Sequence, residues 1–275
     1  MTDPNARFQG SIPENYDRYL GGVLFEPYAR DMAGRLDAKP GSRTLEVACG
    51  TGIVTRRLRE RLPAGARLVA TDLNEPMLEY ARRKLLETRG IEWQQADACA
   101  LPFPPMSFET VVCQFGLMFV PDKPAAVREA RRVLVPGGTF LLSVWDSLER
   151  NRFARLAHET IGGFFEVDPP TFYQVPFSMH DRDALRGLLA DNGFGAVRID
   201  EVELQGESPS ALDLATGLVE GNPVGAAIRE RGTVPADTVI AAVARTVERE
   251  YGDRPVRVPL RALVASGRAG AERRT

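Results

Sequence analysis

Histidine, cysteine and lysine are scarce in this chain of 275 residues, which has two histidines, three cysteines and three lysines. The cysteines have no C-x-x-C spacing and no histidine beside them, so we expect free thiols in a reducing compartment and no metal site. The histidines stand apart from each other and no G-x-S-x-G segment is present, which argues against a Ser-His-Asp hydrolase.

The chain also lacks a long apolar run and an excess of charge of one sign. No run of about 18 apolar residues occurs, and the first residues lack the basic-then-apolar pattern of a signal peptide, so the sequence predicts a cytoplasmic protein without membrane insertion. A net charge of −2 makes no electrostatic case for a nucleic-acid partner. With 44% hydrophobic residues, the chain can bury the core of one large domain or of one domain with a cap.

Short β-favourable runs alternate with helical patterns from residue 43 onward. This order predicts a parallel sheet with helices on both faces, and ligands bind such sheets beyond the carboxyl ends of the strands. The expected strands are 44–48, 67–72, 91–95, 110–114, 139–145 and 197–204. The expected helices are 52–62, 75–88, 125–134, 153–165, 181–193, 209–221 and 236–251.

Two glycines, Gly50 and Gly52, stand where the first strand meets the first helix of this pattern. Glycine lets a ligand approach the backbone, and the helix that follows points free N–H groups at it. Asp72 comes twenty residues after Gly52, the distance at which an acid can accept hydrogen bonds from ribose hydroxyls. A dinucleotide turn would have a third glycine where Thr55 stands and would not require Asp97, so the pattern favours a different adenosine-type ligand.

With these motifs the sequence resembles the class I S-adenosylmethionine-dependent methyltransferases, in the small-molecule branch that includes the ubiquinone and menaquinone C-methyltransferases. The resemblance covers residues 40–146 and resumes near 256–268. Its motifs are LEVACGTG at 45–52, ATDLNEPML at 70–78, QADA at 95–98 with LPF at 101–103, the segment 108–122, and RVLVPGGT at 132–139.

The resemblance implies a Rossmann-like α/β fold: a seven-stranded, mostly parallel sheet with helices on both faces and a helical lid insertion. Its parts would be an N-terminal helical cap over 1–42, the cofactor-binding core over 43–146, and the C-terminal half of the fold over 147–275. The last part would carry lid insertions at 147–180 and 208–253 and the final strand at 256–265. An aromatic lid could instead mediate a homodimer.

The resemblance also assigns residues to S-adenosylmethionine. Glu46 would contact the methionine amino group directly or through water, and the turn backbone would line methionine and ribose. Asp72 would hold the ribose hydroxyls, and Gln114 would lie beside the methionine part and the transferred methyl. The full predicted cofactor set is Tyr16, Glu46, Ala48, Gly50, Gly52, Asp72, Leu73, Met77, Asp97, Ala98 and Gln114.

Apolar and aromatic residues near the ends of the fourth and fifth strands are predicted to face the methyl acceptor. This set is Phe115, Met118, Phe119 and Trp145, joined by Phe172 and Tyr173 of the lid, which we expect to be lined also by Phe164, Phe165 and Phe177. Gln114 and Asp146 are the candidates for a catalytic role, although Asp146 could equally cap the next helix at Asn151 or Arg152, the role that we favour.

Residues 7–37 are predicted to form two short helices broken at Gly21 and Gly22. This segment either packs at the edge of the sheet or folds over the cofactor, where a tyrosine hydroxyl or an arginine would hold a polar tail.

The predicted function is transfer of a methyl group to a small, partly apolar acceptor, quinone-like or a secondary metabolite. The alternatives are a binding protein without activity, a methyltransferase for protein or nucleic acid, and a dehydrogenase.

Overall fold

A single seven-stranded sheet crosses the computed structural model, which describes residues 4–270. Its strand order is β3-β2-β1-β4-β5-β7-β6. The first five strands in the chain run parallel, and β7 is antiparallel to both of its neighbours. The strands are β1 (Arg43–Val47), β2 (Arg67–Asp72), β3 (Ile91–Gln95), β4 (Phe108–Gln114), β5 (Leu134–Trp145), β6 (Phe194–Ser208) and β7 (Val256–Ala269). The predicted mostly parallel sheet is confirmed.

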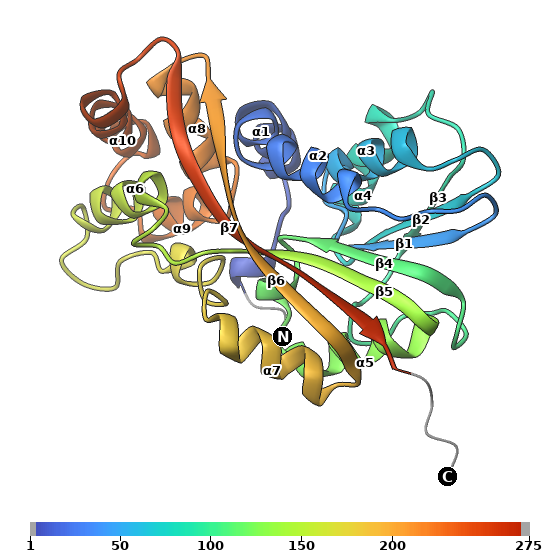
Figure 1. Cartoon of the computed structure of the whole chain (residues 1–275). Helices are drawn as coiled ribbons and strands as arrows, with labels where there is room; N and C mark the ends of the chain where they lie inside the picture. Colours follow the sequence, from blue (N-terminus) through green and yellow to red (C-terminus); the bar gives the residue numbers. More distant parts are fainter. Residues whose placement is uncertain (1–3, 271–275) are drawn as a thin grey trace.

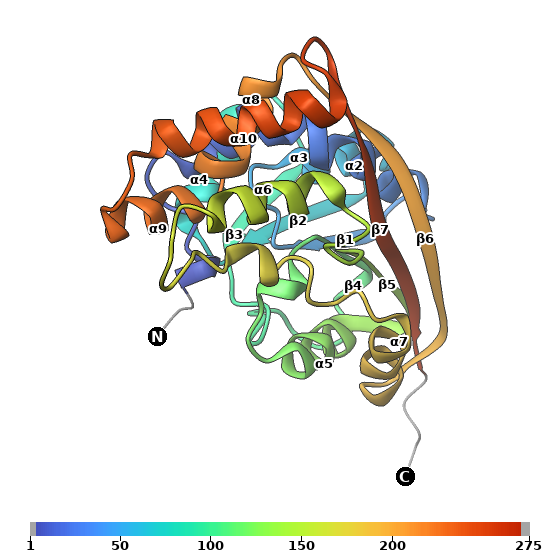
Figure 2. The same cartoon turned by 90° about the vertical axis from the view of Figure 1, so that its left-hand side faces the viewer.

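Helices cover both faces of this sheet and form a separate group at one end of it (Figures 1 and 2). One face carries α2 (Glu26–Gly34), α3 (Ile53–Arg61) and α4 (Glu75–Lys84), and the other carries α5 (Lys123–Val133) and α7 (Arg182–Asp191). The group at the end comprises α6 (Arg152–Gly162), α8 (Ala211–Glu220), α9 (Val224–Arg231) and α10 (Ala236–Tyr251).

The buried strands β1, β2 and β4 explain why the sheet is parallel and covered on both sides. Every residue of β1 after Arg43 is buried, and so is every residue of β2 after Arg67. Strands buried on both faces require helices above and below them. The chain runs outward from β1 to β2 and β3 and then returns to β4 on the other side of β1. The ends of β1 and β4 therefore form the point of reversal at which such sheets bind ligands.

The N-terminal helical run differs from its prediction, because Gly21 and Gly22 do not break it. Helix α1 (Ile12–Asn15) passes into the π-helix η2 (Tyr16–Phe25), which continues through both glycines into α2. A Cβ atom added at Gly21 would lie 3.2 Å from Ile53 Cδ1. The glycine therefore permits close packing of η2 on α3, and it does not act as a helix breaker there.

Helix α9 was not predicted, and β6 is longer than the expected 197–204. The α9 segment is short and contains Gly225, so its own periodicity is weak, and it packs within the helical group at the end of the sheet. Strand β6 pairs with β7 along nearly its whole length, from Phe194 opposite Ala269 to Ser208 opposite Val256. This pairing joins residues far apart in the chain, so no local sequence pattern predicts the full length of β6. No helix within residues 4–270 is long and apolar enough to cross a membrane.

Candidate active site

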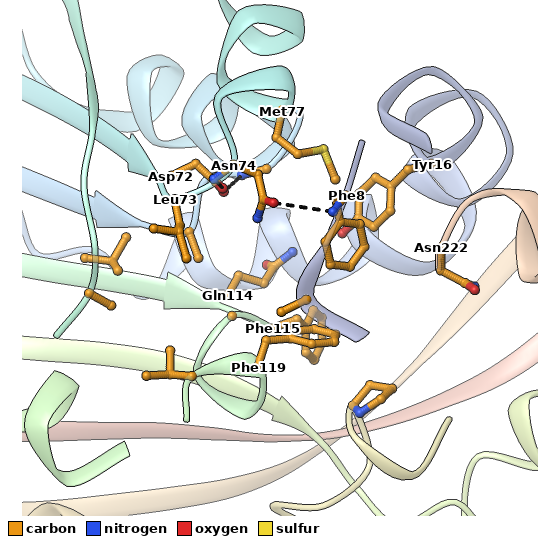
Figure 3. A pocket seen from close by; sticks show the side chains of 18 of the residues that line it. Phe8, Tyr16, Asp72, Leu73, Asn74, Met77, Gln114, Phe115, Phe119 and Asn222 are labelled. Carbon is orange, nitrogen blue, oxygen red and sulfur yellow. Dashed lines mark hydrogen bonds between the residues drawn. The ribbon is translucent and has the colours of Figure 1, made fainter. Parts of the chain in front are cut away.

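A cavity of about 490 Å³ opens beyond the carboxyl ends of β1 and β4, between the sheet, the N-terminal segment and the helical group (Figure 3). One part of its wall comes from the ends of β1, β2 and β3 and the segments that follow them, together with Asp122 before α5 (Lys123–Val133). We call this part the cofactor half: Ala48, Gly50, Asp72, Leu73, Asn74, Met77, Ala96, Asp97, Ala98, Cys99 and Asp122. The other part is apolar and mostly aromatic, which we call the acceptor half: Leu20, Leu24, Phe25, Phe115, Phe119, Trp145, Phe153, Phe172, Tyr173, Pro176, Phe177, Leu218 and Asn222.

The turn between β1 and α3 has a left-handed backbone at Ala48, Gly50 and Gly52, with φ of 57°, 55° and 77°. A Cβ atom on Gly50 would meet nothing within 4 Å, so this glycine leaves open space along the cavity wall. Gly52 has another function. A Cβ there would lie 3.0 Å from Leu85 Cδ1, and the residue does not line the cavity. It allows α3 to pack close to α4.

Asp72 ends β2 and stands in the wall of the cofactor half. Its Oδ2 accepts a hydrogen bond from Gly50 N and its Oδ1 from Asn74 N, each at 2.8 Å. The carboxylate therefore ties the two turns together, and each oxygen still has a lone pair for a ligand. Burial raises the pKa of Asp72 against the effect of these hydrogen bonds.

Leu73, Met77, Asp97 and Ala98 line the same half of the cavity, as the sequence predicted. The side chain of Asp97 accepts a hydrogen bond from Cys99 N through Oδ1 at 2.8 Å, which leaves Oδ2 for another donor. Leu73 and Met77 come from the turn after β2 and the first turn of α4, and Asp97 and Ala98 come from the loop after the neighbouring strand β3.

Glu46 lies behind the turn, and the prediction of a direct contact with a ligand does not fit its position. The side chain is 2% exposed and does not line the cavity. Its Oε2 has no hydrogen-bond partner among the described residues, and neither has the hydroxyl of nearby Thr55. Burial raises the pKa of Glu46 to about 8, with a smaller contribution from the charge of Asp72. A contact through water is the route that remains open to it.

Gln114 ends β4 at the boundary between the two halves, next to Tyr16 of the N-terminal segment (Figure 3). Its Nε2 donates a hydrogen bond to the carbonyl oxygen of Phe25 at 3.1 Å. Because a carbonyl oxygen only accepts hydrogen bonds, the amide atom of Gln114 that faces it must be the nitrogen Nε2 and not Oε1. Oε1 is buried without a partner among the described residues. The ring of Tyr16 stacks on Phe25, with centroids 4.5 Å apart.

Aromatic rings form the acceptor half. Phe115 and Trp145 stack with centroids 4.0 Å apart and planes 5° from parallel. Phe119 lies between Phe8 and Phe172, with centroids 5.6 and 6.1 Å away. The hydroxyl of Tyr173 donates to the carbonyl of Leu218 at 2.8 Å and is therefore occupied.

Three predicted members of the acceptor half lie elsewhere. Met118 is 2% exposed and packs in the core, because it is on the far side of the 3-10 turn η3 (Leu117–Phe119) from Phe119. Phe164 and Phe165 lie in the loop after α6 and do not reach the cavity. Of the predicted lid aromatics, Phe172, Tyr173 and Phe177 line it.

Asp146 is neither a cavity residue nor the cap of α6, so both roles considered for it are wrong. Its Oδ1 accepts from Ser147 N at 2.6 Å, and its Oδ2 forms an ion pair with Arg150 at 2.8 Å. Helix α6 begins after Asn151, whose side chain donates to the carbonyl oxygens of Asp146, Ser147 and Arg261. The carboxylate of Asp146 thus fixes the backbone directly after β5, where the chain leaves the sheet.

Several cavity residues were not predicted. The N-terminal segment contributes Phe8, whose N–H donates to Asn74 Oδ1 at 3.4 Å (Figure 3). The helical group contributes Phe153, Pro176, Leu218 and Asn222. Asn222 lies in the Gly-Asn-Pro segment that the sequence marks as a break between helices, but no local pattern shows which way its side chain points.

The charges on the cavity wall are all negative. Among the described residues that line it, the charged side chains are Asp72, Asp97 and Asp122, in the cofactor half, and no lysine, arginine or histidine is present. The acceptor half has no charged side chain within the same described set. Residues 4–270 also contain no group of three or more metal-ligating side chains.

Comparisons with known proteins agree with this geometry. Residues 45–142 match the model of a methyltransferase domain family. The chain is 31% identical over 200 residues to the ubiquinone/menaquinone biosynthesis C-methyltransferase of Xanthomonas campestris, covering 67% of this chain and 79% of that protein. It is 30% identical over 220 residues to the demethylmenaquinone methyltransferase of Staphylococcus haemolyticus, covering 72% and 91%.

Solved structures share the fold. The YcgJ protein of Bacillus subtilis superposes with a TM-score of 0.58 at 18% identity, over 89% of this chain and 99% of that one. The phosphoethanolamine N-methyltransferase 2 of Haemonchus contortus, in complex with S-adenosyl-L-methionine, gives a TM-score of 0.60 at 14% identity, over 94% and 57%.

The cavity fits S-adenosylmethionine. Gly50 leaves open space against the turn, and Asp72 and Asp97 present carboxylate oxygens with capacity for further donors. The acceptor half beside it is lined mostly by aromatic side chains, which suit an apolar molecule. The chain belongs to the class I S-adenosylmethionine-dependent methyltransferases, the family that includes the ubiquinone/menaquinone C-methyltransferases.

Proposed function

We propose that this methyltransferase acts on a small, uncharged, partly apolar aromatic molecule, of the quinone-like kind named for its relatives. The observation that carries the proposal is the acceptor half of the cavity, which presents stacked rings and no charged side chain among the described residues. A flat apolar ring gains from burial against such walls, whereas a carboxylate or phosphate would be buried there without a cation.

The residues of the cofactor half would hold S-adenosylmethionine in this proposal. Asp72 would accept the ribose hydroxyls, Leu73 and Met77 would pack on adenine, and Asp97 with Ala98 would read its amine. When bound, S-adenosylmethionine supplies a methyl group already activated by the sulfonium. The turn backbone at Ala48 and Gly50 leaves the space along which its amino-acid part would lie.

The protein's own contribution to the reaction would be to position the acceptor and to exclude water from around it. Phe115, Trp145 and Phe119 would orient a ring against the boundary at Gln114, and the N-terminal segment and Phe172 would exclude water. The acceptor half offers no side chain with the chemistry of a general base among its described residues. We therefore expect an uncharged acceptor that is nucleophilic by itself, as an electron-rich ring carbon is.

The test is a pair of acceptors that differ in one charge. The purified protein with S-adenosylmethionine should methylate 1,4-naphthalenediol under anaerobic conditions and leave its 2-carboxylate unmethylated, as measured by mass spectrometry. Equal methylation of both would refute selection for an uncharged acceptor. If S-adenosylmethionine binds and no acceptor in a wider aromatic panel is methylated, the alternative of a binding protein without activity gains support.

The proposal also covers the oligomeric state, the cellular location and the absence of a nucleic-acid partner. The sequence leaves a homodimer open as the alternative role of the lid segments, and it predicts a cytoplasmic location and partners restricted to small molecules. Light scattering of the purified protein tests the first of them, and a monomer at micromolar concentration would contradict it.

A further inference from the structure

The acceptor half of the cavity is mostly apolar but contains two polar side chains that lie together. Among the described residues that line this half, Tyr173 and Asn222 carry the polar groups, besides the indole N–H of Trp145. Tyr173 is in the 3-10 turn η4 (Phe172–Gln174), and Asn222 lies between α8 and α9. Both are outside residues 45–142, which match the methyltransferase domain family. They therefore belong to segments that this chain adds around the acceptor half.

One backbone oxygen joins the two side chains. The carbonyl oxygen of Leu218 accepts a hydrogen bond from Tyr173 Oη and another from Asn222 Nδ2, each at 2.8 Å. Because both donor atoms lie 2.8 Å from the same oxygen, the hydroxyl and the amide are neighbours on the cavity wall. Asn222 Oδ1 accepts from Val224 N at 3.1 Å, which fixes the orientation of the amide. Both side chains are thus held in place by the chain itself.

Each side chain keeps one unused hydrogen-bonding position. The second N–H of Asn222 Nδ2 makes no hydrogen bond within residues 4–270. Tyr173 gives its proton to Leu218, so its oxygen can still accept. Burial raises the pKa of Tyr173, with a smaller opposing effect of the Asn222 amide, so the hydroxyl keeps its proton at neutral pH. A donor and an acceptor side by side suit a hydroxyl group, which accepts from the one and donates to the other.

Figure 3 shows Asn222 on the opposite side of the cavity from Asp72, with Gln114 between them. A ring in the acceptor half would therefore have one edge toward the cofactor half and another toward Asn222. We propose that Tyr173 and Asn222 bind a hydroxyl group on this second edge, which would donate to Oη of Tyr173 and accept from Nδ2 of Asn222. The inference rests on the proposed function and deepens it, because it narrows the acceptor from an apolar aromatic molecule to a phenol or quinol.

The test compares two ligands of similar size on protein saturated with S-adenosylhomocysteine. 1-Naphthol carries a hydroxyl where 1-methylnaphthalene carries a methyl group. By calorimetry, Tyr173→Phe should raise the Kd of 1-naphthol by roughly threefold to tenfold, the loss of one neutral hydrogen bond. The Kd of 1-methylnaphthalene should stay within about twofold, since the ring of residue 173 is retained. Asn222→Leu removes the amide at similar volume and should give the same pattern.

Each variant has a matched control outside the cavity. Tyr28→Phe removes a hydroxyl that donates to the carbonyl of Val202 at 3.0 Å. Asn192→Leu removes an amide that donates at 2.7 Å to the carbonyl four residues earlier, as Asn222 does. Neither control should change the Kd of either naphthalene. The Kd of S-adenosylhomocysteine should stay within about twofold in all four variants, which checks that the fold and the cofactor half are intact.

Three outcomes would overturn the inference. An equal loss for both ligands would mean that Tyr173 and Asn222 act through packing, and no loss for either would mean that another group holds the hydroxyl. Both of these results leave the proposed function standing, because methylation of 1,4-naphthalenediol tests it separately. If the wild-type protein binds neither naphthalene, the aromatic acceptor is refuted together with its hydroxyl site.

Discussion

The carboxylate of Asp17 accepts a hydrogen bond from the hydroxyl of Thr51 at 2.8 Å, which ties the N-terminal π-helix to the glycine turn. The same carboxylate pairs with Lys84 Nζ at 2.5 Å and accepts from Tyr80 at 3.3 Å, both on α4. Its neighbour Tyr16 lies in the wall of the cavity. The segment that closes the cofactor half is therefore held by one half-buried acid that contacts the turn and α4.

Replacing this acid should speed the release of cofactor. Asp17→Asn keeps the shape of the side chain but removes the charge that pairs with Lys84, and we expect the dissociation rate of S-adenosylhomocysteine to rise about fivefold, corresponding to about 1 kcal/mol for a partly buried ion pair. Stopped-flow fluorescence measures the rate. Asp31→Asn, which affects a pair with Arg35 on α2, is the matched control. An unchanged rate in Asp17→Asn would show that apolar packing alone holds the segment.

Asp72→Ala should weaken binding of S-adenosylhomocysteine by about 1–3 kcal/mol, because two ribose hydroxyls lose their acceptor. The N–H groups of Gly50 and Asn74 lose their partner too, so the melting temperature should fall in the same variant. Calorimetry gives the affinity and a thermal scan gives the stability. Glu92→Ala, at an exposed acid on β3, should change neither, and an unchanged affinity in Asp72→Ala would remove Asp72 from the cofactor site.

Phe119→Ala should lower kcat/KM for the acceptor roughly tenfold and leave the affinity for S-adenosylhomocysteine within about twofold. The ring contacts Phe172 and Phe8 across the acceptor half, and each aromatic contact contributes about 0.5–1.5 kcal/mol. Phe103→Ala removes a ring that packs on Phe108 outside the cavity and serves as the control. Weaker cofactor binding with normal turnover would place Phe119 in the cofactor half instead.

Glu46 should make the protein less stable as the pH rises. Burial raises the pKa of this carboxyl to about 8 in the folded state, from 4.5. Between these two values the unfolded chain holds fewer protons at this site than the folded one, so the free energy of unfolding falls with pH, by up to ~1.4 kcal/mol per pH unit. Below pH 4.5 both states are protonated and the contribution is fully retained.

The measurement for Glu46 is urea unfolding at pH 5.5 and 8.5, in wild type and in Glu46→Gln. Glutamine cannot ionise, so the variant should gain stability relative to wild type as the pH rises. Glu92→Gln, at an exposed acid, should follow wild type. Parallel pH dependence in wild type and Glu46→Gln would mean that Glu46 ionises normally in the folded protein.

Local patterns in the sequence were sufficient for the core of the fold. Strand and helix alternate from β1 to β3 and again from β4 to β5, and the turns carry local signals, such as the glycines at 50 and 52 and the acid at 72. Parallel strands put their carboxyl ends on one edge of the sheet. Asp72 and Gln114, which end the two strands that flank β1, therefore lie at the same edge of the sheet.

The acceptor half could not be worked out in this way, because its residues come from segments far apart in the chain. Phe8, Phe119 and Phe172 meet across more than 160 positions, and the sequence marks none of them as neighbours. Met118 and Phe119 are adjacent and equally apolar, and only the orientation of one 3-10 turn sends the first into the core and the second to the cavity.

The sequence by itself determined the parallel sheet, the glycine turn, and the place of Asp72 and Asp97 at the ends of their strands, because these depend on residues close together in the chain and on the edge that parallel strands share. Tertiary structure alone decided that Glu46 lies behind the turn, that Asp146 pairs with Arg150, and that η2 runs unbroken through Gly21. Each of these outcomes depends on which distant group occupies the neighbouring space, and packing sets that only once the whole chain has folded.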